Sequence, residues 1–246
     1  MEENKTQGRI AAIVLAGGSG KRMGGSVPKQ YRKLCGRPMI TYSLEAFEKS
    51  GVDQVVLVTG REEVEYCRKE IVEKWGFQKV AAVVPGGKER YHSVYQGLKA
   101  LKNCDYVLIH DGARPLLSQD IIERAITGAV EYGACVIGMP VKDTIKVADE
   151  DGFAVRTPDR SRLWQIQTPQ AFSYELARRA YDRIMADETL QQGITDDAMV
   201  AERAEKIKVK LLPGSYENLK VTTPEDLYLA EALLARRMAV EKNEKS

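Results

Sequence analysis

The chain has 246 residues, of which 43% are hydrophobic and 29% are charged, the balance of an ordinary globular protein. Its 37 basic and 35 acidic residues give a net charge of +2, which argues against a general nucleic-acid-binding surface. The four cysteines are widely spaced and form no C-x-x-C pair, so we expect neither a disulfide framework nor a zinc site, and we predict a reducing, cytoplasmic location.

Short apolar runs alternate with amphipathic segments through the first 140 residues. We predict strands at residues 10–16, 54–59, 80–84, 106–110 and 134–139. We predict helices at residues 39–50, 62–75, 91–101 and 120–132, where apolar residues recur at helical spacing. The alternation predicts an α/β protein with a Rossmann-like, mostly parallel sheet and helices on both faces. Ligands of such sheets bind beyond the carboxyl ends of the strands.

This alternation stops after Pro140. Residues 141–148 and 153–156 have the pattern of short strands, and the Asp151-Gly152 pair between them is a strong hairpin signal. We therefore expect a β-hairpin arm over residues 141–160 that projects from a single domain covering residues 1–246. Such an arm either covers a site or clasps a partner subunit, and we favour the clasp.

The C-terminal third returns to helical patterns, predicted at residues 171–186, 196–204 and 224–240, with one strand at residues 207–212. The last helix has a clear start, because Thr223 suits the cap, Pro224 the first position and Glu225 the first turn. No internal repeat or low-complexity tract interrupts the chain.

A glycine-rich basic loop follows the first predicted strand, in the segment AAIVLAGGSGKRMGGSVPK that ends at Lys29. Glycines let the backbone approach a ligand and turn its N–H groups toward it, and Arg22 and Lys29 suit a polyphosphate. The phosphate-contacting candidates in this loop are Ala16, Gly17, Gly18, Gly20, Arg22 and Lys29. The alternative is a tight turn between strand and helix with incidental charges.

Two better-known phosphate loops do not fit this segment. A dinucleotide-binding loop needs a third glycine where Met23 stands. A Walker A loop needs a glycine where Leu15 stands, and a Ser or Thr for magnesium where Arg22 stands. The remaining pattern, L-A-G-G-x-G-x-R-M followed by P-K, resembles the nucleotidyltransferases that activate sugars as nucleoside diphosphates.

Two further candidate clusters follow predicted strands. In His110–Pro115, Asp111 is placed for a ribose hydroxyl or a magnesium ion, and Arg114 follows it, although Asp111 alone would equally suit a turn. In the stretch GGKERYHS, Gly87, Arg90 and Ser93 could surround the edge of a base, although this segment alone would equally suit a helix start.

Two more clusters combine cations with hydroxyl groups. The first joins Thr157–Trp164 to the QTPQ stretch that contains Thr168. The second places Lys220 inside a strand-like run, where a buried lysine would need an anionic partner. The chain has only two histidines, His92 and His110, which argues against a hydrolase whose catalysis depends on histidine.

The whole set of motifs resembles one family, the cytidylyltransferases of the non-mevalonate isoprenoid pathway, over residues 10–234. The resemblance rests on LAGGSGKRM, PKQY, GGKERYHSV, HDGARP, DTIK, RSRLWQIQTPQAF, TDDA and NLKVTTPEDL. It implies a nucleotidyltransferase fold and transfer of CMP from CTP to 2-C-methyl-D-erythritol 4-phosphate. The products would be 4-diphosphocytidyl-2-C-methyl-D-erythritol and pyrophosphate, with magnesium bound to the triphosphate.

The resemblance also assigns roles to residues. Arg22 and Lys29 would stabilise the pentacoordinate transition state, and Arg160 and Lys220 would hold the attacking phosphate. Cytosine would be read by Gly87, Arg90 and Ser93; Asp111 and Arg114 would lie near the ribose, the metal and the second substrate; Thr144, Thr168 and Thr222 would line the acceptor site. The family is homodimeric, which implies that the arm brings Thr144 and Arg160 to the partner's Lys29.

Two alternatives stay open at this point. One is a ribitol-5-phosphate cytidylyltransferase, which shares the core motifs, although DTIK, RSRLW and TDDA favour the isoprenoid enzyme. The other is a non-catalytic nucleotide-binding relative, against which the complete set of motif cations speaks. No apolar run approaches the roughly 18 residues of a membrane span, and the polar N-terminus does not resemble a signal peptide, so we expect no membrane partner.

Overall fold

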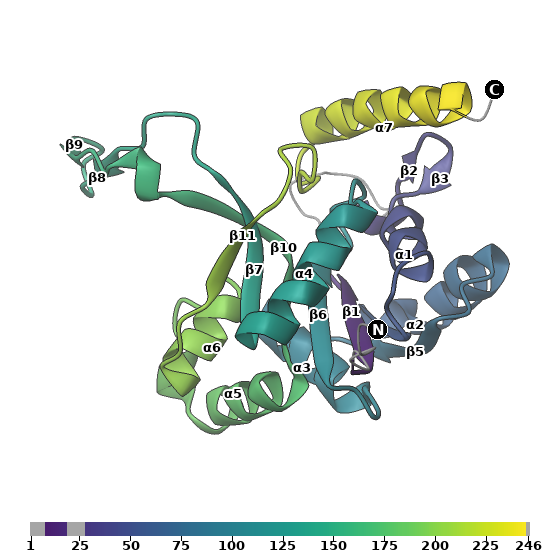
Figure 1. The fold of residues 1–246 in the computed structure, drawn as a ribbon, viewed down its shortest axis with the longest axis horizontal. Coiled ribbons are helices and arrows are strands. Elements are labelled where there is room, and N and C mark those ends of the chain that lie inside the picture. Colours follow the sequence, from purple (N-terminus) through teal and green to yellow (C-terminus); the bar gives the residue numbers. More distant parts are fainter. Residues whose placement is uncertain (1–7, 19–27, 245–246) are drawn as a thin grey trace, which may run out of the picture.

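The computed structural model describes residues 8–18 and 28–244. A seven-stranded sheet forms its centre, in the order β11-β7-β10-β6-β1-β4-β5 (Figure 1). The strands are β1 (Ile10–Ala16), β4 (Gln54–Thr59), β5 (Val80–Pro85), β6 (Tyr106–Asp111), β7 (Ala134–Pro140), β10 (Trp164–Ser173) and β11 (Lys210–Pro213). All of these run in one direction except β10, which is antiparallel to both neighbours.

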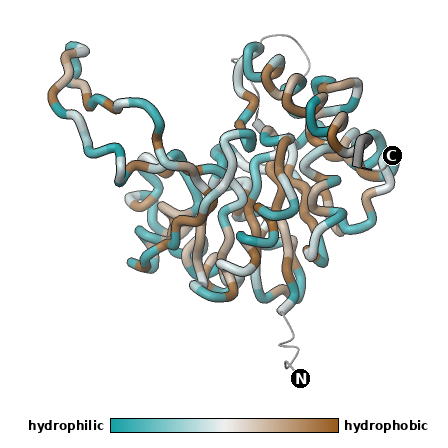
Figure 2. Tube along the Cα trace, turned by 45° about the horizontal axis from the view of Figure 1, so that its top comes forward, coloured by the Kyte–Doolittle hydropathy of each residue, from teal (hydrophilic) through white to brown (hydrophobic). Residues whose placement is uncertain are grey.

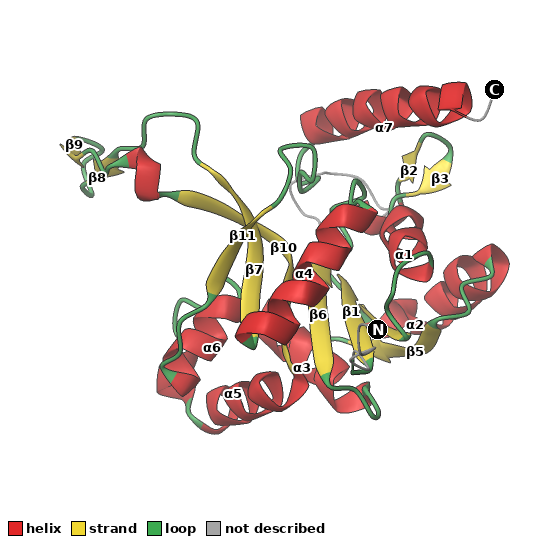
Figure 3. Cartoon of the chain, in the orientation of Figure 1, coloured by secondary structure: helices red, strands yellow, loops and turns green. Residues whose placement is uncertain are grey.

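Helices cover both faces of this sheet, as the alternating pattern predicts (Figure 3). The helices of the described chain are α1 (Ile40–Glu48), α2 (Val64–Tyr66), α3 (Arg90–Ala100), α4 (Gln119–Tyr132), α5 (Tyr174–Ala186), α6 (Asp197–Glu205) and α7 (Pro224–Glu244). Side chains of α1 and α4 pack on one face, and those of α3, α5 and α6 on the other. The predicted α/β class and layer arrangement are confirmed.

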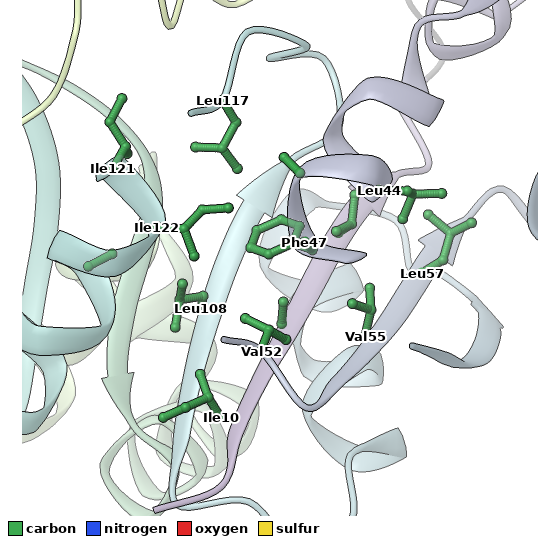
Figure 4. Close-up of a cluster of buried hydrophobic side chains, with 14 of the residues drawn as sticks. Ile10, Leu44, Phe47, Val52, Val55, Leu57, Leu108, Leu117, Ile121 and Ile122 are labelled. Atoms are coloured by element: carbon green, nitrogen blue, oxygen red, sulfur yellow. The ribbon is translucent and has the colours of Figure 1, made fainter. Parts of the chain in front are cut away.

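The two faces hold separate apolar clusters. Figure 4 shows the first, in which Phe47 of α1 lies beside Ile122 of α4 and Leu108 of the sheet, all fully buried. In Figure 2 the hydrophobic positions gather along the central strands, because strands buried on both faces have few polar positions. Burying this surface supplies the main favourable free energy of folding.

One strand was missed by the sequence patterns. The prediction begins a helix at residue 171, but residues 171–173 belong to β10, and α5 begins at Tyr174. Ala171 and Phe172 are buried there, and β10 pairs with β6 on one side and β7 on the other. Pairing with two neighbouring strands satisfies the backbone N–H and C=O groups of this buried segment. This gain outweighs the weak intrinsic preference of the segment for strand.

The predicted arm is present and projects from the body of the molecule (Figure 1). Its strands are shorter than predicted: β8 is Val147–Ala148 and β9 is Ala154–Arg156, so residues 141–146 are not strand. The hairpin turn is closed by Asp149, whose N–H donates to the carbonyl of Phe153 over 3.0 Å. A two-stranded ribbon with no core beneath it sustains only limited pairing.

Smaller differences lie at element ends. Residues 207–209 precede β11 rather than belong to it, and the predicted helix at 62–75 is a succession of a 3-10 turn (Arg61–Glu63), α2 and a π-helical turn (Cys67–Glu73). A short hairpin, β2 (Lys33–Leu34) with β3 (Arg37–Pro38), was not predicted and packs beneath α7.

Gly97 allows α3 to lie directly on β1. A Cβ atom at Gly97 would stand 2.7 Å from Cγ2 of the buried Ile13. We expect Gly97→Ala to lower the free energy of unfolding by about 1–3 kcal/mol, because overpacking outweighs the better helix preference of alanine. Urea unfolding measures the change. Gly51→Ala is the control, since nothing lies within 4 Å there. Equal stability of both variants would contradict this packing argument.

Candidate active site

A pocket of about 430 Å³ opens at the carboxyl ends of the strands. The three predicted segments that follow β1, β5 and β6 meet here, together with the turn after Pro28 and the loop after β11. The lining residues are Leu15, Ala16, Gly17, Gly18, Lys29, Gln30, Gly87, Lys88, Glu89, Arg90, Ser93, Asp111, Ala113 and Lys220. A volume of this size accommodates a nucleotide-sized ligand.

The glycine-rich loop enters the pocket at the end of β1. A Cβ atom at Gly17 would lie 3.3 Å from the carbonyl carbon of Thr59, so β4 leaves little room for a side chain. Ala16, Gly17 and Gly18 line the pocket as predicted. The remaining candidates of the loop, Gly20 and Arg22, lie outside the described residues.

Lys29 begins a 3-10 turn, Lys29–Tyr31, that follows Pro28. Its ammonium group donates to the carbonyl of Val221 over 3.1 Å. The next residue, Gln30, is buried and donates to the carbonyl of Ala16, and the Tyr31 hydroxyl donates to Glu63 over 2.8 Å. These bonds hold the turn against the end of β1, which places Lys29 on the wall of the pocket.

Asp111, the last residue of β6, carries the central charge of the pocket. Its carboxylate pairs with Arg90 Nε over 3.0 Å and with Lys220 Nζ over 2.7 Å. Burial alone would raise the pKa of Asp111, but Arg90, Lys220 and Arg114 together outweigh it and hold the pKa far below its usual range. The carboxylate is therefore ionised at neutral pH. The expected anionic partner of Lys220 is present, but residues 218–222 form a loop rather than the predicted strand-like run, and the Lys220 side chain is 39% exposed rather than buried.

Beneath the Asp111 carboxylate, the Asp111 backbone, Thr168 and His110 form a buried chain of polar contacts. The N–H of Asp111 donates to Thr168 Oγ1 over 3.1 Å, and this hydroxyl lies 3.0 Å from His110 Nδ1. Burial lowers the pKa of His110 to about 4, so the imidazole is neutral at pH 7. In this structure Thr168 and His110 act on the backbone beneath the pocket.

Arg114 connects β6 to the loop that carries Lys220. Its guanidinium is buried and donates through Nη1 to the carbonyl of Asn218 over 2.7 Å. The N–H of Val221 donates to the carbonyl of Ala113 over 2.8 Å. These two bonds dock the loop on the end of β6, and so they fix the position of the Lys220 backbone.

The segment after β5 forms another wall of the pocket. The N–H of Gly87 donates to Ser93 Oγ over 3.1 Å, which folds this loop onto the first turn of α3. A Cβ atom at Gly87 would stand 2.4 Å from Cβ of His92, so the close turn requires glycine here. Gly87, Arg90 and Ser93 thus share one wall, as the base-reading prediction requires.

Five predicted site residues of the described chain do not line the pocket: Arg114 and Thr168 bond to the backbone beneath it, and three others lie further away. Thr144 and Arg160 belong to the arm, where Arg160 Nη1 donates to the carbonyl of Lys142 over 2.9 Å. The Thr222 hydroxyl donates to Asp226 Oδ2 over 2.8 Å at the start of α7. Among the described residues, none of these three lines the pocket of its own chain.

Among the residues that sequence reasoning did not assign to the site, two hold its parts in place. Asp197 accepts two hydrogen bonds from Arg90, from Nη1 and Nη2, each 2.8 Å long. Gln30 lines the pocket and bonds to the end of β1. Both lie within motifs that carry the family resemblance, TDDA and PKQY, but no local pattern assigns their side chains to this pocket.

The donors available for a metal ion are few. Within residues 8–18 and 28–244, no group of three or more His, Cys, Asp and Glu side chains is arranged to hold one. The pocket does contain two carboxylates, Glu89 and Asp111. Magnesium characteristically takes one or two carboxylates together with substrate phosphates and water, so this donor set fits magnesium that arrives with a triphosphate.

The strand order of the sheet is that of a nucleotidyltransferase fold, and the basic pocket lies at the carboxyl edge of this sheet. The family model described as 2-C-methyl-D-erythritol 4-phosphate cytidylyltransferase matches residues 10–236. The chain belongs to this family. It is 52% identical to the protein of that name from Lachnospira eligens, over 91% of this chain and 98% of the relative. It is 48% identical to that from Lachnoclostridium phytofermentans, over 92% and 96%.

Solved structures agree with the family match. One is 4-diphosphocytidyl-2C-methyl-D-erythritol synthase from Anaerococcus prevotii, with a TM-score of 0.81, 33% identity, and coverage of 93% of this chain and 97% of that one. Another is 2-C-methyl-D-erythritol 4-phosphate cytidylyltransferase from Thermus thermophilus, with a TM-score of 0.74, 28% identity, and coverage of 91% and 98%. Within the described part of the chain, no helix has the length and apolar composition that crossing a membrane requires.

Proposed function

We infer that this protein transfers CMP from CTP to 2-C-methyl-D-erythritol 4-phosphate in isoprenoid precursor synthesis. The products are 4-diphosphocytidyl-2-C-methyl-D-erythritol and pyrophosphate. The inference is carried by one observation: the family match spans residues 10–236, and the strand ends that it includes form a single basic pocket.

The reaction needs alignment and charge stabilisation more than proton transfer. A phosphate monoester is largely ionised at neutral pH, so its oxygen can attack the α-phosphorus of CTP without a general base. A new P–O bond forms there as the bond to the β-phosphate breaks, and pyrophosphate leaves with the electron pair. Cations placed around the α-phosphate stabilise the charge that gathers in this step.

We propose that Lys29 and Arg22 stabilise that charge, while Lys220 and Arg160 hold the attacking phosphate. The positions of Lys29 and Lys220 on the pocket wall support these roles. Magnesium bound with CTP would be held at Asp111 and would neutralise part of the triphosphate charge.

The remaining roles are proposals that follow from placement and resemblance. Gly87, Arg90 and Ser93 read the base, and Asp111 also lies at the ribose. Arg114, Thr144, Thr168 and Thr222 complete the acceptor site with Asp111. The four free cysteines are consistent with work in the cytoplasm.

We propose a homodimer in which each arm completes the partner's site. The support is positional: Arg160 lies on an arm that projects from the body, and the described lining of the pocket contains no arm residue (Figure 1). An acceptor phosphate bound there would need Arg160 from a second copy. The exposed Phe153 and Val155 near the arm's tip suit burial against such a partner.

The purified protein tests the function directly. We expect pyrophosphate release with CTP and 2-C-methyl-D-erythritol 4-phosphate, with kcat/KM at least about tenfold above that for ribitol 5-phosphate. Both acceptors are offered at equal magnesium and CTP concentrations, and release is measured by a coupled assay. Preference for ribitol 5-phosphate would identify the sister activity, and CTP binding without release from either acceptor would indicate a non-catalytic relative.

A further inference from the structure

Arg90 joins two carboxylates on different elements. Its Nε donates to Asp111 over 3.0 Å, and its Nη1 and Nη2 donate to the two oxygens of Asp197, each over 2.8 Å. Asp111 lies in the pocket, whereas Asp197 lies behind it at the start of α6 and does not line the pocket. The side chain of Asp197 is fully buried, and that of Arg90 is 28% exposed.

Bonds from α5 and β10 hold Asp197 and the first turn of α6 in place. The Tyr181 hydroxyl of α5 donates to it over 2.5 Å. The preceding residue, Asp196, caps α6 by accepting from the N–H of Met199 over 2.9 Å. Gln170 of β10 accepts from the N–H of Ala198 over 2.8 Å and donates to Asp196 over 3.1 Å. The first turn of α6 therefore presents a fixed anion to the rear of Arg90.

We propose that Asp197 is a positioning residue of the nucleotide site, acting through Arg90 on Asp111. The planar guanidinium matches a carboxylate best when it binds two oxygens at once. Asp197 occupies the Nη1 and Nη2 edge of Arg90, which leaves a single bond to Asp111 and keeps the second oxygen of Asp111 for Lys220. The proposal rests on the proposed function, in which this pocket binds CTP.

The charges around Asp111 point in the same direction. Arg90, Lys220 and Arg114 carry three positive charges, and Asp111 and Asp197 carry two negative charges, so removing the charge of Asp197 leaves Asp111 alone to balance the three cations of this set. Without the charge of Asp197, Arg90 would be drawn to both oxygens of Asp111 and would displace Lys220. The pocket wall would then present its cations in a different arrangement to CTP.

The test is Asp197→Asn, which keeps the shape of the side chain and removes its charge. We expect KM and Kd for CTP to rise at least about tenfold, and KM for 2-C-methyl-D-erythritol 4-phosphate to rise as well, because the displaced Lys220 also holds the attacking phosphate. A merely structural defect would reduce the amount of active enzyme, and so would lower apparent kcat without this change in KM. Steady-state kinetics and calorimetric titration with CTP measure the two quantities.

Glu205→Gln is the matched control on the same pair of helices. Glu205 is a nearly buried carboxylate of α6 that pairs with Arg179 and Arg183 of α5, away from the pocket. Its loss should lower the unfolding temperature and leave KM for CTP within about twofold. If this control raises KM for CTP as much as Asp197→Asn does, Asp197 has no special role.

Tyr181→Phe covers the case in which Asp197→Asn does not fold. It removes one hydrogen bond to Asp197, and KM for CTP should rise about two- to fivefold in the same direction. An unchanged KM and Kd for CTP in the folded variants would overturn the proposal. Wild-type protein that binds CTP but transfers no CMP would overturn the proposed function instead, and the Kd comparison would still decide the role of Asp197.

Discussion

Replacing Lys29 by alanine is expected to lower turnover at least about a hundredfold while CTP affinity changes by less than about tenfold, because this ammonium acts on charge that develops in the transition state. A hundredfold loss corresponds to about 2.7 kcal/mol of transition-state stabilisation. The turn at Lys29–Tyr31 is anchored by Gln30 and Tyr31, so the truncation should leave the pocket wall in place.

Single-turnover kinetics and calorimetric titration with CTP separate the two effects of Lys29→Ala. Lys33→Ala is the control, because Lys33 is an exposed lysine four residues later that does not line the pocket. Its turnover should stay within about twofold of the wild-type value. A loss of less than about tenfold in Lys29→Ala would show that Lys29 has only a binding or structural role.

Replacing Arg160 by alanine is expected to raise KM for 2-C-methyl-D-erythritol 4-phosphate at least about thirtyfold, since a charge-assisted contact to phosphate contributes about 2 kcal/mol or more. KM for CTP should change little, because Arg160 lies outside the described lining of the nucleotide pocket. Arg156→Ala removes another exposed cation of the same arm and serves as the control. Normal behaviour of Arg160→Ala toward the acceptor would contradict the assigned role.

Mixing the two variants tests whether the arm serves its partner. When the Lys29→Ala and Arg160→Ala proteins exchange subunits at random, half of the dimers contain one of each. A site that takes Lys29 from one chain and Arg160 from the other is then intact once per mixed dimer, so about a quarter of all sites should regain activity. If both residues of a site come from one chain, mixing restores nothing.

The strand and loop that open the chain were predictable because their signals lie in adjacent residues. The apolar run of β1 and that of β4 have the observed bounds, and Gly17 and Gly18 line the pocket as the loop pattern predicts. Parallel strands place their carboxyl ends at one edge, so the meeting of Gly87 and Asp111 with this loop also followed from the alternation.

Other predictions were incomplete where the structure depends on more than the pattern of adjacent residues. The arm was expected from the Asp151-Gly152 pair, but its strands are shorter because no core supports them. The strand β10 was missed since its place between β6 and β7 depends on pairing with residues far away in the chain. Local propensity does not report such long-range pairing.

The sequence by itself determined the α/β class, the glycine-rich loop and the family, because each rests on residues close together in the chain or on a whole set of motifs. Only the tertiary structure decided the partners of the charges. Arg90 meets Asp197 across 107 positions, and Lys220 meets Asp111 through a loop docked by Arg114. These contacts depend on strand order and helix packing, which join residues that no local pattern connects.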